Sequence, residues 1–221
     1  MRRYRSNTDV RVEALMKQEH PELWARLMKE RAAATRQRYR LGFPCPPQRI
    51  TARVDKIFHH LLRYYGSAHR PQVLLQILQR SECAEIFWRA FDRAWSVVDA
   101  SWSYHQEFLA LLRRHLPERK FSYLSSNNRP LLETLPTIAT VYRGCSADRV
   151  HGIAWTLDPG VAECFARGHR GIPVQNAVIA EAQIPREAVF AAFAEREESE
   201  VVLDPSYLKN LRWNNVSRQQ V

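Results

Sequence analysis

Two glutamates near the C-terminal end of the chain are the side chains best suited to chemistry. Glu198 and Glu200 flank Ser199 and precede the apolar residues 201–203. Residues two apart in an extended chain project to one face, so the two carboxylates are expected to lie side by side. Neighbouring carboxylates can divide acid–base and electrostatic roles, and in glycoside hydrolysis they stabilise an oxocarbenium-like cation. The pair therefore suits cleavage of a glycosidic bond, although acidic loops are also typical of solvated surface.

Two earlier β-rich segments carry residues that could hold an anionic ligand. In residues 141–144, Arg143 ends a β-rich run and Gly144 follows it. A guanidinium there can fork onto a pyrophosphate while bare backbone lets the ligand approach. Residues 152–156 end in the hydroxyl of Thr156. The non-functional alternatives are that Arg143 is an ordinary surface arginine at a turn, and that Trp155 and Phe165 simply pack in the core.

In this order, the three segments resemble the Arg…Ser-Thr-Ser…Glu-x-Glu pattern of the mono-ADP-ribosyltransferases. These are NAD-consuming enzymes typified by bacterial toxins, and the resemblance covers roughly residues 136–213. It implies that Arg143 grips the NAD phosphates and that the backbone of Gly144 contacts the nicotinamide amide. It also implies that Glu200 holds the ribose 2′-hydroxyl and steadies the cation, while Glu198 positions or deprotonates the acceptor.

The resemblance assigns residues 152–156 to the Ser-Thr-Ser strand. In that family the first serine orients the catalytic glutamate, and here its position is Ala154, which leaves the hydroxyl to Thr156. A loop over residues 167–173 would face phosphate with Arg167, His169 and Arg170. The implied NAD-binding set is Arg143, Gly144, Ala154, Trp155, Thr156, Phe165, Arg167 and Arg170. Glu200, Glu198 and Arg143 form the implied catalytic set.

NAD would have to be held without the commoner nucleotide-binding fold. The sequence contains no Gly-x-Gly-x-x-Gly, and no βαβ alternation surrounds its glycines, which argues against a hydride-transferring enzyme. Cys45, Cys83, Cys145 and Cys164 are far apart and lack zinc-site spacing. We therefore expect no metal, and buried free thiols in a reducing cytoplasm.

The elements that must position these residues begin with helices. Helical patterns cover residues 9–40, with a break or restart near Pro21, and then residues 50–65 and 71–79. Over residues 81–115 a seven-residue repeat of apolar residues includes Trp88, Trp95 and Trp102. This stripe predicts the core face of one helix with His105 as a hydrogen-bonded core histidine, although tryptophans can also stack on bases.

After residue 117 the pattern becomes β-rich. Strands are expected at residues 139–143, 152–155, 177–184, 188–193, 200–203 and 208–213. One helix, residues 159–166, could be capped by Thr156 or Asp158. The sequence thus predicts an α+β protein: a basic helical region over residues 1–120, packed on an ADP-ribosyltransferase-like split β-sandwich over residues 121–221.

The positive charge lies outside the segments with the motifs. The net charge is +10; residues 1–135 carry 24 Lys and Arg against 13 Asp and Glu, whereas residues 136–221 carry 9 against 10. This excess of positive charge favours nucleic acid as the first candidate partner and an anionic membrane surface as the second. The non-functional alternative is a basic surface that is simply solvated. The basic start lacks an apolar signal segment and no apolar run is long enough to span a bilayer, so we expect a cytoplasmic protein without membrane contact.

These observations combine into a toxin-like NAD-dependent ADP-ribosyltransferase that modifies a macromolecule. RNA or DNA is the favoured acceptor because of the basic half, and protein arginine is the second choice because Glu-x-Glu often accompanies arginine acceptors in the family. The same residues are also compatible with an NAD glycohydrolase and with an inactive nucleic-acid-binding protein. An antitoxin or a chaperone is a further class of partner that such an enzyme could have.

Overall fold

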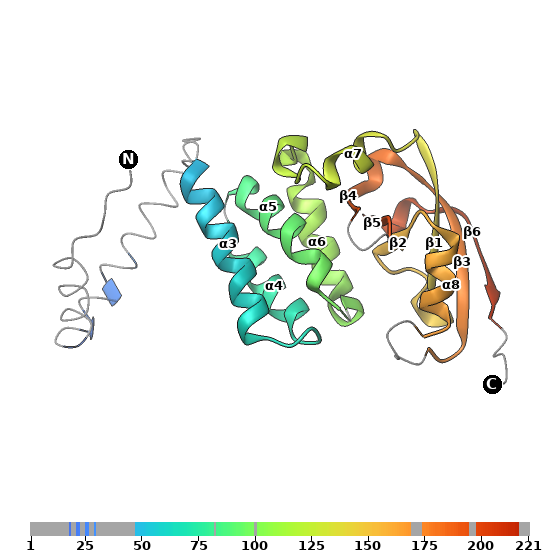
Figure 1. Cartoon of the computed structure of the whole chain (residues 1–221), viewed down its shortest axis with the longest axis horizontal. Coiled ribbons are helices and arrows are strands. Elements are labelled where there is room, and N and C mark those ends of the chain that lie inside the picture. Colours follow the sequence, from blue (N-terminus) through green and yellow to red (C-terminus); the bar gives the residue numbers. More distant parts are fainter. Residues whose placement is uncertain are drawn as a thin grey trace. The chain divides into compact units, whose positions relative to one another are not determined.

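The chain divides into two compact units, Met1–Pro46 and Pro47–Val221. The computed structural model describes residues 47–216, apart from 82, 100, 169–173 and 195–197. In the first unit it describes six positions, which are helical and exposed: Gln18, Pro21, Glu22, Ala25, Arg26 and Lys29. Four closely spaced arginines of the basic half, Arg31, Arg36, Arg38 and Arg40, lie outside the described residues. The boundary expected at residues 120–121 falls inside the second unit, which holds both helices and strands (Figure 1).

The second unit begins with helices near the expected positions. α3 (Pro47–Tyr64) ends just before Gly66, and α4 (Arg70–Gln79) begins with a proline in its first turn. α5 (Ala84–Ala94), α6 (His105–His115) and the short α7 (Asn128–Glu133) follow. Among the helices in the described part of the chain, none combines the length and apolar character needed to cross a membrane.

The single helix expected over residues 81–115 is wrong. Two 3-10 turns, η1 (Trp95–Val97) and η2 (Ser101–Tyr104), separate α5 from α6. Between them Val98 has an extended backbone, with φ −101° and ψ 116°. Two β-branched valines followed by Asp99 disfavour a continuous helix, because valine loses side-chain freedom there and aspartate competes for backbone hydrogen bonds. The regular apolar repeat concealed this break.

The tryptophans of the repeat consequently differ in burial: Trp88 and Trp95 are buried in the core, whereas Trp102 is half-buried. Trp95 is buried, with its ring centroid 5.0 Å from Phe91 and 5.4 Å from Phe108. Trp102 is half-buried and stacks on His105 with centroids 4.0 Å apart. The Nδ1 atom of His105 lies 2.5 Å from the carbonyl oxygen of Trp102, so this histidine is hydrogen-bonded as expected, but it is half-buried and not in the core.

Six antiparallel strands form one sheet in the order β4–β5–β2–β1–β3–β6. All six lie at the expected places, and their bounds are β1 Ile138–Ser146, β2 Ala154–Thr156, β3 Ala177–Pro185, β4 Val189–Phe193, β5 Glu200–Leu203 and β6 Lys209–Asn215. β1 is longer than expected because Gly144 does not end it. Gly144 and Cys145 continue the ladder with Ile179 and Val178 of β3.

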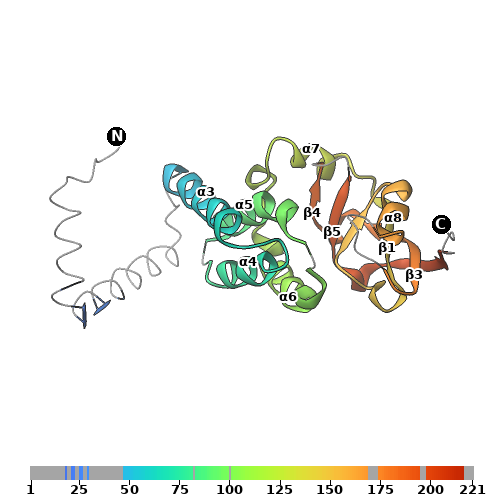
Figure 2. The same cartoon turned by 60° about the horizontal axis from the view of Figure 1, so that its bottom comes forward.

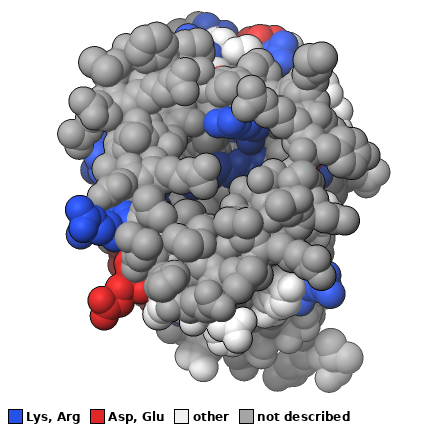
Figure 3. Space-filling view, turned by 90° about the vertical axis from the view of Figure 1, so that its left-hand side faces the viewer, with Lys and Arg blue, Asp and Glu red and all other residues white. Residues whose placement is uncertain are grey.

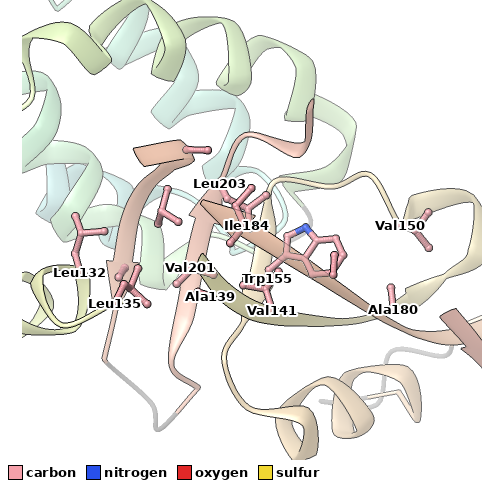
Figure 4. Close-up of a cluster of buried hydrophobic side chains, with 14 of the residues drawn as sticks. Leu132, Leu135, Ala139, Val141, Val150, Trp155, Ala180, Ile184, Val201 and Leu203 are labelled. Atoms are coloured by element: carbon pink, nitrogen blue, oxygen red, sulfur yellow. The ribbon is translucent and has the colours of Figure 1, made fainter. Parts of the chain in front are cut away.

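A hydrophobic cluster covers one face of this sheet. Figure 4 shows members from four strands: Leu203 of β5, Trp155 of β2, Val141 of β1 and Ile184 of β3. Val189 of β4 also belongs to the cluster. The three strands between β4 and β3 also contribute members, so the cluster is continuous from β4 to β3. The second unit is an α+β structure in which helices precede an antiparallel sheet.

The helices join the sheet at its β4–β5 end (Figure 2). Arg113 of α6 makes a two-point contact with Asp204, with Nε and Nη2 at 2.6 and 2.7 Å from the carboxylate oxygens. Arg119 donates to the carbonyl oxygens of Val189 and Phe190, both at 2.6 Å. The contacts of Arg119 satisfy backbone carbonyls of β4, an edge strand of the sheet.

The helix expected at residues 159–166 is confirmed as α8 (Pro159–Ala166). Asp158 caps it and accepts a hydrogen bond from the backbone N–H of Gly160 at 2.7 Å. α8 packs directly on β1 at Gly144, where an added Cβ would lie 1.8 Å from the carbonyl oxygen of Ala162. Gly144 therefore has no side chain because helix α8 occupies that space.

The expectation of buried free thiols holds for one of the described cysteines. Cys145 is buried, Cys83 is half-buried and Cys164 is exposed, while Cys45 lies outside the described residues. All three described cysteines are free thiols.

Candidate functional site

A cavity of about 250 Å³ lies between the η1–η2 turns and the sheet. One wall comes from the helical part: Trp95, Ser96, Val98, Asp99, Ser101 and Trp102. The opposite wall comes from the sheet, the loop before β5, and α8: Tyr142, Arg143, Gly144, Ala154, Trp155, Thr156, Val161, Phe165, Glu198 and Glu200. The three sequence segments that could do chemistry thus meet at one site.

Sheet register explains why distant segments meet here. Thr156 of β2 pairs with Tyr142 of β1 on one side and with Glu200 of β5 on the other. Directly paired residues in antiparallel strands project to the same face. The short strand β2 therefore sets Tyr142, Thr156 and Glu200 in one row across the sheet.

Glu200 is held by a residue from the helical part. It is the first residue of β5 and is half-buried, and its Oε1 accepts a hydrogen bond from the indole Nε1 of Trp95 at 2.8 Å. The two residues are 105 positions apart in the chain. A carboxylate with a hydrogen-bond donor in a partly enclosed cavity can stabilise a developing positive charge at a defined point.

Glu198 reaches the same cavity by a different route from the one expected. Ser199, between the two glutamates, has a positive φ of 41°, and β5 begins only at Glu200. The extended-chain argument for a shared face is therefore wrong at this point. Left-handed backbone at a residue other than glycine is held in place by its surroundings. Here the surrounding bonds run from Leu157 N–H to the Ser199 carbonyl at 3.0 Å, and from the Thr156 hydroxyl to the Glu198 carbonyl at 2.5 Å.

Arg143 lies in the interior of β1, so the expectation that it ends a strand is wrong. Its Nε donates to the carbonyl oxygen of Arg149 at 3.1 Å, and its Nη1 donates to the carbonyl of Ala154. An added Cβ at Gly152 would lie 2.5 Å from Nη2 of Arg143, so the bare backbone at Gly152 makes room for the guanidinium. The side chain thus ties the segment before β2 to β1 while it lines the cavity.

The charge of Arg143 is balanced locally. Burial lowers the pKa of its guanidinium, whereas the neighbouring Cys145 and Glu200 act in the opposite direction. Burial in turn raises the pKa of the Cys145 thiol, with Arg143 opposing that change. A guanidinium stays charged even so, and Arg143 and Glu200 therefore supply opposite charges to one cavity.

Trp155 and Phe165 differ in their surroundings. Trp155 is 2% exposed, belongs to the hydrophobic cluster and donates from Nε1 to the Gly152 carbonyl at 2.7 Å, which agrees with simple core packing. Phe165, on α8, is 37% exposed and turns its ring to the cavity. Core packing therefore does not explain Phe165.

The loop expected to face phosphate is described in part. Arg167 is the C-cap residue of α8 and pairs with Glu163, and it is not among the residues that line the cavity. His169 and Arg170 lie outside the described residues.

Reasoning from the sequence missed the helical wall. The apolar repeat places Trp95 and Trp102 on a continuous core face and predicts no role for Ser96, Asp99 and Ser101. The available signal was the run of valine, serine and aspartate after Trp95, which is unfavourable inside a helix. Such a run at the end of an aromatic helix indicates a turn that can present side chains to a cavity.

Comparisons of this chain with models of protein families, with curated proteins and with solved structures find no match. The case for function therefore depends on the residues of the cavity itself.

Proposed function

We propose that this protein is an NAD-dependent mono-ADP-ribosyltransferase of toxin-like type, with the antiparallel sheet serving as part of an ADP-ribosyltransferase-like split β-sandwich. One observation carries the proposal: the three segments that resemble the family's motifs line a single cavity. The three segments were identified from their order and residue types, which carry no information on their positions in space. Their meeting is what a shared active site requires.

The size and lining of the cavity suit part of a dinucleotide. Sites that enclose whole drug-sized ligands measure about 300–1,000 Å³, and the volume of about 250 Å³ here is slightly smaller. Nicotinamide and its ribose would occupy it, with aromatic contacts from Tyr142 and Phe165. The rest of the dinucleotide would extend outward past Arg143, whose guanidinium is suited to a phosphate.

The chemistry follows from the two carboxylates. When the bond between nicotinamide and ribose breaks, positive charge develops on the ribose, and the Glu200 carboxylate would stabilise it. Nicotinamide leaves with the bonding electrons, and an acceptor nucleophile takes its place on the anomeric carbon. Glu198, which lines the same cavity from the loop before β5, would orient that acceptor or take its proton.

The favoured acceptor is nucleic acid, on grounds of charge. The excess of Lys and Arg lies in residues 1–135, which also supply the helical wall of the cavity. On the face drawn in Figure 3, Lys and Arg side chains of described residues appear at several places, with acidic side chains at others. Phosphate backbones bind such surfaces in a salt-dependent way.

Release of nicotinamide by the wild-type protein and by Glu200→Gln tests the proposal. The substitution keeps the size of the side chain and removes its charge, so kcat should fall by on the order of a hundredfold or more. Glu187→Gln is the matched control, because Glu187 is exposed in the 3-10 turn η7 (Arg186–Ala188) and is not among the residues that line the cavity, so turnover should be unchanged. Equal turnover in wild type and Glu200→Gln would refute the assignment.

Labelled NAD incubated with separate pools of RNA, DNA and protein identifies the acceptor. Label on RNA or DNA supports the favoured acceptor, and label on arginine side chains supports protein. Nicotinamide release without label on any pool indicates a glycohydrolase. Salt-dependent nucleic acid binding without nicotinamide release indicates an inactive binding protein.

A further inference from the structure

We propose that Trp95 is a positioning residue for Glu200, so that the helical part of this unit completes the active site. The inference rests on the proposed function for its catalytic consequence. The observation behind it is the hydrogen bond from the Trp95 indole N–H to Oε1 of Glu200, at 2.8 Å. A hydrogen bond to a charged group is stronger than one between neutral groups, and its direction fixes the orientation of the carboxylate.

The side chains of β2 that lie beside Glu200 are directed elsewhere. Ala154, at the start of β2, has no hydrogen-bonding side chain. Thr156, directly opposite Glu200, has one hydroxyl proton, and that proton is directed to the carbonyl oxygen of Glu198 at 2.5 Å. The same hydroxyl accepts from the backbone N–H of Asp158 at 3.1 Å. The Thr156 hydroxyl therefore shapes the loop before Glu200, whereas the Trp95 indole N–H contacts the Glu200 carboxylate itself.

The indole is itself rigidly held, which positioning requires. Trp95 is 3% exposed and is the C-cap residue of α5. Its ring meets Phe108 edge-on, with an interplanar angle of 87°, and contacts Phe91 at a centroid distance of 5.0 Å. Packing from two helices thus aims a single N–H at one oxygen atom of Glu200.

This arrangement couples the helical part to the chemistry. The break between α5 and α6 brings Trp95 to the cavity wall, and Arg113 of α6 anchors the same helices to Asp204, just beyond β5. Glu200 and Asp204 bracket β5, so both ends of this strand are tied to the helices. The helical part is therefore a component of the active site as well as a carrier of charge.

The experiment compares Trp95→Phe with Trp88→Phe. Trp88 is a matched control in α5: it is fully buried, and its indole N–H donates to the carbonyl oxygen of His115 at 3.1 Å, away from the cavity. Both substitutions should lower the unfolding temperature. Trp95→Phe alone should lower kcat for nicotinamide release by roughly ten- to a hundredfold, with KM for NAD changed less than about threefold.

A second replacement guards against misfolding. The 3-benzothienyl analogue of tryptophan at position 95 keeps the shape of the ring and replaces the N–H by sulfur, and it should reproduce the loss in kcat. A kcat within about threefold of wild type for this analogue overturns the inference, as does an equal loss in Trp88→Phe.

Indole N–H resonances separate this inference from the proposed function. In Glu200→Ala the resonance of Trp95 should move further than that of Trp88, whether or not the protein cleaves NAD. If it does not move further, the contact is refuted directly. A wild-type protein that releases no nicotinamide refutes the proposed function and the catalytic consequence, while the resonance still decides whether Trp95 donates to Glu200.

Discussion

Gly144→Ala should destabilise the protein by displacing α8 from the sheet. The new Cβ would lie 1.8 Å from the carbonyl oxygen of Ala162 and 2.5 Å from the backbone nitrogen of Ala166. Both are backbone atoms of α8, so no side-chain rotation can relieve the contact. To reach an ordinary separation of 3.4 Å, the helix must move by about 1.6 Å.

The cost should lie at the upper end of that for overpacked sites, about 3 kcal/mol. For a protein of this size, the unfolding temperature would drop by roughly 6–12 °C. Because α8 carries Val161 and Phe165 into the cavity, nicotinamide release should fall as well.

Thermal unfolding followed by circular dichroism measures the effect. Gly66→Ala is the matched control, since an added Cβ there meets nothing within 4 Å, and its unfolding temperature should stay close to that of wild type. If Gly144→Ala unfolds within about 2 °C of wild type, α8 does not pack on Gly144 as described.

Three further predictions concern the cavity and its support. Glu198→Ala should abolish labelling of the acceptor while slow NAD hydrolysis persists, and parallel loss of both activities would contradict the division of labour between the glutamates. Arg143→Lys should weaken NAD binding by roughly 1–3 kcal/mol in calorimetry, because an ammonium cannot reproduce the planar fork; equal affinities would contradict a role in phosphate binding. Burial favours a higher pKa for Asp204, but hydrogen bonds from Arg113 and Ser206 outweigh it and lower the pKa below the ordinary 3.8. Since the folded pKa is the lower one, this stabilisation is complete above pH 3.8 and is lost as the pH falls through the folded pKa. Denaturant unfolding should therefore show a steeper acid loss of stability in wild type than in Arg113→Gln, and equal slopes would show that the pair does not stabilise the fold.

The sheet and α8 were predictable because their signals are local. β-rich runs between turn residues marked all six strands, and Asp158 followed by Pro159 marked the start of α8. The extent of β1 was less predictable. A glycine at position 144 suggests a strand end, yet Gly144 pairs with Ile179 within β1. Its lack of a side chain allows α8 to pack against the strand and does not mark a turn.

The break between α5 and α6 shows the limit of periodicity. Trp88, Trp95 and Trp102 keep a helical spacing, and their apolar character concealed the unfavourable run that follows Trp95. A repeat reports which residues are apolar, but it does not report whether the backbone between them stays helical. The valines and Asp99 after Trp95 end the helix, and α5 and α6 contact each other through the rings of Trp95 and Phe108.

The sequence by itself determined the residue types of the candidate site. Arg143, Thr156, Glu198 and Glu200 were all named from order and spacing, and all four line the cavity. Their chemistry depends on functional groups that every sequence displays directly. Local order also gave their secondary structure, apart from the position of Arg143 within β1 and the positive φ at Ser199.

Only the tertiary structure decided what surrounds these groups. Strand register placed Thr156 opposite Glu200, and the packing of helices on the sheet brought Trp95 to the same carboxylate across 105 residues. Arg143 donates to the backbone carbonyls of Arg149 and Ala154. Every residue has a backbone carbonyl, so the sequence does not indicate which ones will accept these hydrogen bonds. Contacts between residues far apart in the sequence depend on how all the helices and strands pack together, and no local sequence pattern encodes that packing.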